Sequence, residues 1–128
     1  FYKYELDKKG KKAKTVDPTA YDVIAPSVTA EKREFDEHEI IDRMMVTFCN
    51  ETVRCLEDNI VATPAEADMA MIMGVGFPAF RGGPCRYIDQ VGVAEYVALC
   101  DKYAHLGKGY EAPQMLRDMA ANNKKFYG

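Results

Sequence analysis

The stretch FDEHEIIDRMMVTFCNETVRCLED, residues 35–58, decides the fold of this chain. Apolar side chains recur along it at steps of three and four residues, which places them on one face of an α-helix. They are Ile41, Met44, Met45, Phe48, Thr52, Cys55 and Leu56, and the polar residues assigned to the other side are Asp42, Arg43, Asn50, Glu51, Arg54 and Glu57. Asp36 suits the N-cap position and Glu37 the first turn, so the pattern predicts a long amphipathic helix from about Glu37 to Asp58.

A second helix is expected to begin at Thr63. Thr63 and Glu66 have the spacing of a capping box, and Pro64 occupies the first helical position, where proline is favoured. This helix should end at Gly74, because glycine readily adopts the left-handed conformation that terminates helices.

The rest of the chain contains shorter helical patterns. One follows Pro84, a second covers residues 92–106 and closes at Gly107, and a third begins near Ala112 and Pro113. Residues 16–24 suggest a short helical or irregular stretch. Since no apolar–polar alternation is long enough to indicate a sheet, the sequence predicts an all-α fold with about five helices.

The amino-acid composition favours a single compact domain and argues against a membrane-spanning or nucleic-acid-binding protein. A length of 128 residues with 48% hydrophobic content is enough for one compact domain. The net charge of -3 argues against nucleic acid as a partner, because phosphate binding needs clustered Lys and Arg in excess. No apolar run approaches the ~18 residues of a membrane span. We therefore expect a soluble, cytoplasmic protein with no membrane span and no nucleic-acid partner.

Neither a metal site nor a catalytic set is expected in this chain. The four cysteines, at positions 49, 55, 85 and 100, show no C-x-x-C spacing, and His38 and His105 lie far apart. No histidine is spaced to activate a thiol, so the cysteines are interpreted as reduced core residues. The acidic residues around His38 are explained by the positive end of a helix.

The N-terminal residues have the character of a junction between domains. The chain begins with Phe1 rather than methionine and soon enters the charged, glycine-containing stretch at residues 5–12. An aromatic segment followed by such a stretch is typical of the end of one domain and the start of a linker. We expect residues 1–25 to be the end of a preceding domain and a linker, and residues 26–128 to form the helical domain.

The segment GVGFPAFRGGP, residues 74–84, is the strongest candidate for function. It formally satisfies the G-x-G-x-x-A dinucleotide fingerprint, but a capped helix precedes it and Pro78 interrupts the stretch that would have to be helical, so no cofactor site is expected there. Glycine-rich backbone permits the close approach of a ligand or another backbone. Arg81 and Arg86, beside Phe77 and neighbouring aromatic residues, can hold a phosphate or an adenine, or can make a domain interface.

Several segments in this order resemble the last domain of the alpha subunit of the bacterial fatty-acid oxidation complex. They are IIDRMM at residues 40–45, NETVRCLE at 50–57, AEAD at 65–68, GVGFP at 74–78 and GGP at 82–84. The resemblance covers almost the whole chain, and FYKY at residues 1–4 is similar to the end of the preceding domain of that family.

The resemblance implies a fold similar to the C-terminal domain of 6-phosphogluconate dehydrogenase. It also implies a parent enzyme with an enoyl-CoA hydratase/isomerase region, an NAD-binding domain and two tandem helical domains, of which this chain is similar to the second. The implied parent oxidises 3-hydroxyacyl-CoA with NAD. The partners it implies are the NAD-binding and first helical domains of the same polypeptide, a thiolase beta subunit and an acyl-CoA substrate.

Two site residues follow from the resemblance alone. Asp42 stands where the sister repeat has a catalytic asparagine, and a carboxylate cannot donate the hydrogen bond that an amide donates. The residue before the first glycine of the G-x-G-F-P loop is assigned to substrate binding in that family, and here it is Met73. The chain is thus expected to contribute an apolar substrate contact at Met73 and no catalytic residue.

The expected role is to complete a dehydrogenase by packing on its other domains and lining the acyl-CoA cleft. The isolated chain should be inactive. One alternative is a free-standing helical interaction module, and another is an autonomous acyl-CoA carrier, for which Arg81 and Arg86 supply little phosphate-binding capacity.

Overall fold

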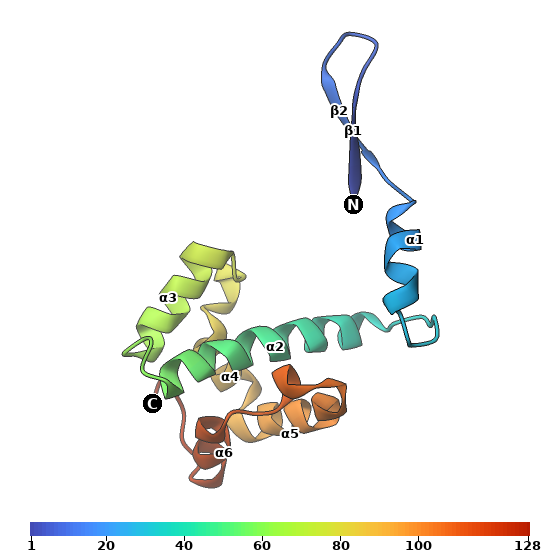
Figure 1. The fold of residues 1–128 in the computed structure, drawn as a ribbon. Helices are drawn as coiled ribbons and strands as arrows, with labels where there is room; N and C mark the ends of the chain where they lie inside the picture. Colours follow the sequence, from blue (N-terminus) through green and yellow to red (C-terminus); the bar gives the residue numbers. More distant parts are fainter. The chain divides into compact units, whose positions relative to one another are not determined.

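The computed structural model describes residues 1–128 as two compact units, Phe1–Glu34 and Phe35–Gly128. Their elements carry the labels of Figure 1. The larger unit holds all of the buried core residues. A functional site built on a packed core therefore belongs to residues 35–128, and the smaller unit is a separate segment.

The first unit contains a β-hairpin that the sequence did not indicate, and the all-α class expected of the chain describes the second unit. Strands β1 (Tyr2–Leu6) and β2 (Lys12–Val16) pair antiparallel, with Tyr2 opposite Val16. The turn is fixed by the Asp7 carboxylate, which accepts hydrogen bonds from the backbone N–H groups of Lys9 and Lys11, both at 2.8 Å. Five-residue strands rich in lysine give too short an alternation to stand out in a sequence.

The hairpin is followed by the short helix α1 (Ala20–Ile24) and a 3₁₀ turn (Ala25–Ser27). This agrees with the short helical stretch expected at residues 16–24. No residue of these four elements is buried.

The second unit is helical, as expected. Its α-helices are α2 (Glu37–Glu57), α3 (Pro64–Val75), α4 (Pro84–Val91), α5 (Val93–Tyr103) and α6 (Gln114–Ala121). Short 3₁₀ turns follow α3 at Ala79–Arg81 and α5 at Ala104–Leu106 and Lys108–Tyr110. Figure 1 shows α2 as the longest helix, and it contacts each of the other four. The predicted long helix is therefore the central element of the domain.

The buried face of α2 differs from the one that apolar spacing predicts. Cys49 is fully buried, as expected, and so are Val46 and Val53, which the apolar spacing did not place on the core face. Asn50, assigned to the polar side, is also 0% exposed. In contrast, Met44 is 67% exposed. The true core face is turned toward Asn50, and the apolar residues of the N-terminal half of α2 remain partly at the surface.

Asn50 is buried because its amide is fully used. Its Nδ2 donates to the carbonyls of Gly109 at 3.1 Å and Glu111 at 3.2 Å, and its Oδ1 accepts from the Tyr96 hydroxyl at 3.1 Å. A buried polar side chain is tolerated when all of its hydrogen bonds are made. Asn50 therefore connects α2 to α5 and to the segment before α6.

The cysteines are free thiols, in agreement with the sequence. Cys49, Cys85 and Cys100 are fully buried. Burial disfavours the thiolate and raises the pKa of Cys49 to about 12. These side chains pack as small apolar groups and remain protonated near neutral pH.

Helix α3 starts at the predicted capping box. The Glu66 N–H donates to Thr63 Oγ1 at 3.2 Å, and the Thr63 N–H donates to Glu66 Oε2 at 3.2 Å. The helix ends two residues later than expected, because Gly76 rather than Gly74 has the left-handed conformation, with φ +78°. Gly74 lies inside the helix.

Thr63→Ala is expected to lower the free energy of unfolding by about 1 kcal/mol, because it removes the side chain that caps the helix. Urea unfolding followed by circular dichroism measures the change. Thr15→Ala, at an exposed hairpin position, is the matched control and should leave the stability of the helical unit unchanged. Equal stability of Thr63→Ala and the wild type would contradict a role for the cap.

Candidate functional site

The glycine-rich segment 74–84 connects the end of α3 to the start of α4. Its backbone N–H groups are largely consumed within it: Phe77 donates to the Met71 carbonyl, Arg81 to Pro78 and Gly82 to Ala79, each at 3.0 Å. A helix rather than a strand precedes it. The segment therefore lacks the strand, turn and open helix N-terminus that hold a dinucleotide, and these residues do not fit NAD.

Asp68 holds the end of the glycine-rich segment in place through hydrogen bonds. Its carboxylate is buried and accepts three hydrogen bonds, from the Cys85 N–H at 2.7 Å, the Arg86 N–H at 3.2 Å and the Tyr127 hydroxyl at 2.7 Å. The first two donors belong to the first turn of α4, where a negative charge is favourable. Asp68, on α3, thus joins α3, α4 and the C-terminal residues.

The close approach of the Asp68 side chain explains why position 83 is a glycine. A Cβ at Gly83 would lie 2.3 Å from the Asp68 Cβ and Cγ, and Gly83 also has φ +110°. Gly82 has φ +80° as well. Both glycines therefore have a positive φ, a backbone conformation that favours glycine.

The aromatic residues of the segment have different environments. Phe77 is 3% exposed and packs against Phe48 with ring centroids 5.3 Å apart, so it anchors the segment in the core. Phe80 is 83% exposed. A phenylalanine exposed to this degree beside a rigid loop is available for contact with another surface.

The two arginines are held over aromatic rings. The Arg81 guanidinium carbon lies 5.2 Å from the Phe80 ring centre and 5.6 Å from that of Tyr87. The Arg86 guanidinium carbon lies 3.8 Å from the ring centre of Tyr127. Both side chains are exposed, and they engage different aromatic residues rather than forming a single anion-binding pair.

A small apolar pocket lies between this segment and the N-terminal half of α2. Its volume is about 270 Å³, and its lining consists of Ile41, Met44, Met45, Pro78, Phe80, Arg81 and Tyr87. Arg81 is its only charged residue. Met73, expected at a substrate contact, does not line the pocket and is 78% exposed on α3. The structure thus gathers Arg81 and Phe80 at one apolar pocket and leaves Met73 and Arg86 outside it.

Asp42, which the family resemblance aligns with an asparagine of the sister repeat, contacts two residues of one neighbouring helix. Its Oδ2 accepts a hydrogen bond from the Tyr103 hydroxyl at 3.2 Å and lies 3.9 Å from Lys102 Nζ. Both partners belong to α5, so Asp42 joins α2 to α5. These contacts are consistent with a structural role for the Asp42 carboxylate, which links the two helices.

Sequence reasoning missed Asp68 and Tyr127. Asp68 belongs to the AEAD segment that the family resemblance singled out, but its spacing gave no role, since its partners are seventeen or more residues away. Tyr127 lies in a short polar tail without periodicity. Only the fold brings these residues together.

Two further features bear on the class of protein. No group of three or more His, Cys, Asp or Glu side chains is arranged to hold a metal ion. None of the helices combines the length and the apolar composition that crossing a membrane requires.

Comparison with known proteins gives relatives over the whole chain. The fatty acid oxidation complex subunit alpha of Acinetobacter baumannii strain AYE is 89% identical over 100% of this chain, and that of Psychrobacter sp. strain PRwf-1 is 68% identical over 99% of it. The chain spans 18% of the length of either relative.

A solved structure shares the fold. The crystal structure of M. tuberculosis FadB2 superposes with a TM-score of 0.58 at 24% identity, covering 66% of this chain and 32% of that one. The family model for the 3-hydroxyacyl-CoA dehydrogenase C-terminal domain matches residues 40–126, which is more than half of the chain. The chain therefore belongs to the family of 3-hydroxyacyl-CoA dehydrogenase C-terminal domains.

Proposed function

We propose that this chain is the second helical domain of the alpha subunit of a fatty acid oxidation complex. In this role it supports the NAD-dependent oxidation of 3-hydroxyacyl-CoA by packing on the NAD-binding and first helical domains and by lining the acyl-CoA cleft. NAD binds outside the chain, since residues 74–84 do not fit it. A thiolase beta subunit completes the set of partners.

The observation that carries this proposal is the exposed apolar surface around the glycine-rich segment. Met44, Met73, Val75 and Phe80 are all largely exposed, and Phe80 and Met44 border the apolar pocket. A concentration of large apolar side chains on a surface is typical of an interface. The rigid attachment of the segment through Asp68 and Phe77 keeps Phe80 and Arg81 in a fixed position for docking.

The roles of individual residues are part of the proposal. Arg81 and Phe80 contact the neighbouring domain, Arg86 contacts it or the ligand from outside the pocket, and Phe77 holds the segment from within the core. Met73 contributes an apolar contact to the acyl-CoA cleft, for which its exposure on α3 makes it available.

Residues 1–25 are proposed as the end of the preceding domain and a linker, and residues 26–128 as the second helical domain. The unburied hairpin β1–β2 supports a separate N-terminal segment, while the compact helical unit begins at Phe35. A two-stranded hairpin without a core is marginally stable in water. Its strands therefore need a surface supplied by another part of the protein.

The purified chain is expected to form no NADH from a 3-hydroxyacyl-CoA and to show no heat of NAD binding by calorimetry. The physical reason is that neither a cofactor site nor a catalytic set lies in these residues. Turnover above a blank without enzyme would contradict the proposal, and the full-length protein serves as the positive control.

Phe80→Ser in the full-length protein is expected to lower the dehydrogenase kcat/KM at least tenfold, because a polar group replaces the most exposed apolar residue of the interface. The hydratase activity of the same preparation should be retained. Leu106→Ser, which changes an exposed apolar residue outside the pocket, is the matched control. Unchanged dehydrogenase activity in Phe80→Ser would exclude this surface as the interface.

A further inference from the structure

The dipeptide Phe-Tyr occurs twice in the chain, at residues 1–2 and again at residues 126–127. The two copies have different surroundings. Phe126 and Tyr127 are half-buried, whereas Phe1 is 83% exposed and Tyr2 is 53% exposed. The second copy therefore shows how this dipeptide is bound by a helical domain, and the groups of the first copy can be compared with it one by one.

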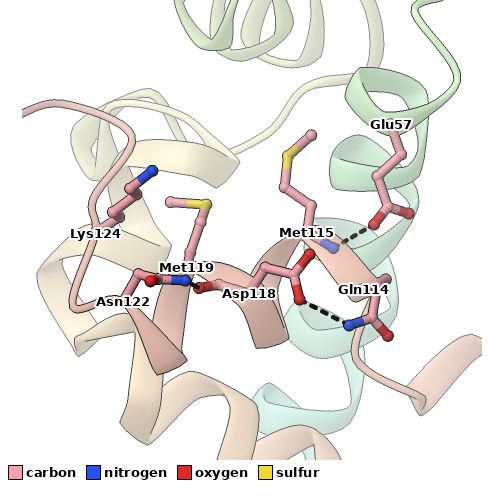
Figure 2. Close-up of a pocket in the computed structure, with 7 residues that line it drawn as sticks. All are labelled: Glu57, Gln114, Met115, Asp118, Met119, Asn122 and Lys124. Atoms are coloured by element: carbon pink, nitrogen blue, oxygen red, sulfur yellow. Dashed lines mark hydrogen bonds between the residues drawn. The ribbon is translucent and has the colours of Figure 1, made fainter.

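The bound copy lies in the tail that follows α6. The side-chain amide of Asn122 donates to the Asp118 carbonyl at 2.7 Å, as Figure 2 shows. The Lys124 N–H donates to the Met119 carbonyl at 2.8 Å. Between these contacts Asn123 has a left-handed backbone, with φ +51°, a conformation that asparagine tolerates better than most residues. The tail therefore turns at the end of α6 and reaches α4.

Two carboxylates and a guanidinium bind the tail, and we call Asp68, Asp89 and Arg86 the Tyr127 site. Asp89, on α4, accepts the N–H groups of Phe126 and Tyr127 at 3.0 and 2.8 Å. Asp68 accepts the Tyr127 hydroxyl at 2.7 Å. The Arg86 guanidinium carbon lies 3.8 Å from the centre of the Tyr127 ring. Tyr127 thus uses its backbone donor, its hydroxyl and one face of its ring.

Tyr2 has the corresponding donors free. The Asp17 N–H donates to the Phe1 carbonyl at 3.0 Å, and bonded and non-bonded pairs alternate along an antiparallel ladder. Tyr2 and Val16 are therefore a non-bonded pair, and the Tyr2 N–H points to the edge of β1 that no strand covers. The Tyr2 hydroxyl has no hydrogen-bond partner in the chain. Lys14 Nζ lies 3.7 Å from the centre of the Tyr2 ring, so the hairpin itself supplies the cation over that ring.

The surface around this dipeptide is basic and apolar. Residues 1–16 contain six lysines and two acidic residues, and one of these acids, Asp7, is turned to the backbone of the hairpin turn. Phe1 and Tyr2 border a mostly apolar pocket of about 330 Å³, whose one acid, Asp17, is paired with Lys3 at 3.3 Å. Charge complementarity favours a partner that places carboxylates beside apolar side chains. The Tyr127 site has this composition, because the tail also packs on a buried apolar cluster.

The Tyr127 site of this chain cannot bind Tyr2 as well. Asp68 and Asp89 already accept hydrogen bonds from the tail. A second copy of the chain has the same tail in its own site, so it offers no free site either. The first Phe-Tyr pair therefore needs a site of this kind on a different domain.

We propose that Phe1 and Tyr2 bind the helical domain that precedes them in the full-length protein, in a site with two carboxylates that correspond to Asp68 and Asp89. This inference rests on the proposed function, in which residues 1–25 end a preceding domain and the chain is the second of two tandem helical domains. One carboxylate accepts the Tyr2 hydroxyl, and the other accepts the Tyr2 N–H. These contacts attach the hairpin, which has no core of its own, to the preceding domain.

The full-length sequence gives the first test. An Asp or Glu should stand at each of the two positions of the preceding domain that align with Asp68 and Asp89. A residue without a carboxylate at the position aligned with Asp68 would overturn the proposal. A preceding region that is not a helical domain of this family would refute the proposed function itself.

Hydrogen–deuterium exchange of the full-length protein measures the attachment directly. Tyr2→Phe removes the hydroxyl and keeps the ring, so it should raise the exchange rate of the hairpin amides about fivefold, the effect of losing one hydrogen bond to a charged group. Tyr4→Phe is the matched control, because Tyr4 is also exposed and lies on the same face of β1, and it should leave the exchange rate unchanged. Equal rates in Tyr2→Phe and the wild type would overturn the proposal.

A second substitution identifies the acceptor. Replacing the acid aligned with Asp68 by its amide should raise hairpin exchange at least as much as Tyr2→Phe does. Adding Tyr2→Phe to that variant should raise it no further, because the same hydrogen bond is already lost. Independent effects of the two substitutions, in an enzyme with normal dehydrogenase activity, would refute the proposed site and leave the proposed function intact.

Discussion

Gly83→Ala is expected to destabilise the helical unit by about 3 kcal/mol, because a methyl group there has no room and the backbone conformation is unsuited to alanine. The added Cβ would lie 2.3 Å from the Asp68 Cβ and Cγ, and the φ of +110° is one that L-residues rarely adopt. Asp68 is buried and accepts three hydrogen bonds, so a displacement that makes room for the methyl group would weaken or break them. Chemical unfolding of the 128-residue chain measures the loss.

Two other glycines provide graded controls. Gly74 is helical, and a Cβ added to it would have no other atom within 4 Å, so Gly74→Ala should be neutral or stabilise by about 0.5 kcal/mol. At Gly82 the nearest atom is Arg86 Cγ at 2.9 Å, which belongs to a flexible side chain, so the expected cost is intermediate, about 1 kcal/mol. Equal effects at all three positions would contradict the steric explanation.

In the full-length protein Gly83→Ala should also lower dehydrogenase activity while hydratase activity remains. The proposed reason is that Phe80 and Arg81 lose their fixed position when the segment is displaced from Asp68. Measuring both activities on one preparation separates the possibilities. Equal loss of the two would indicate global unfolding, and loss of neither would show that the segment is only a surface connection.

The course of the helices could be predicted because their signals are local. The capping box at Thr63, the proline at position 84 and the periodicity of residues 37–57 each depend on neighbours within a few residues. The hairpin was missed because each strand has only five residues: Tyr2, Tyr4 and Leu6 alternate with polar residues in β1, but β2 has no comparable apolar alternation.

The phase of α2 could not be predicted from hydrophobicity alone. Asn50 has the character of a surface residue in the sequence, because its four hydrogen-bond partners, on α5 and on the segment before α6, lie 46 to 61 residues away. Conversely, the apolar spacing predicts that Ile41 and Met44 are core residues, but both are exposed. Apolar spacing does not distinguish a domain core from an interface with another domain. The two residues whose burial was wrongly predicted thus line the apolar pocket of the surface proposed for docking.

The candidate site was located by the sequence but not explained by it. Residues 74–84 stand out through their glycines and prolines, whereas the residue that organises them, Asp68, acts over a distance of seventeen residues to Cys85. The structural role of a buried acidic residue can be recognised only when the hydrogen-bond donors around it are known from the fold. This applies equally to Tyr127, whose hydroxyl reaches Asp68 from the end of the chain.

Asp68→Ala is expected to cost about 4 kcal/mol, the largest stability loss among these predictions. The substitution removes the acceptor for the Cys85 and Arg86 N–H groups and leaves the first of these buried without a partner. An unsatisfied buried donor costs about 1–3 kcal/mol, and hydrogen bonds to a charged acceptor are stronger than those between neutral groups. Urea unfolding should show a lower midpoint with an unchanged slope.

Tyr127→Phe isolates one of the three bonds, because it removes the hydroxyl and keeps the ring beneath the Arg86 guanidinium. Its expected cost is about 1 kcal/mol in the wild type and close to zero in the Asp68→Ala background, since the hydroxyl then has no carboxylate to donate to. The double-mutant cycle therefore measures the coupling between α3 and the C-terminal residues. Additive effects of the two substitutions would mean that the Tyr127 hydroxyl bond contributes nothing and that Asp68 stabilises the fold through α4 alone.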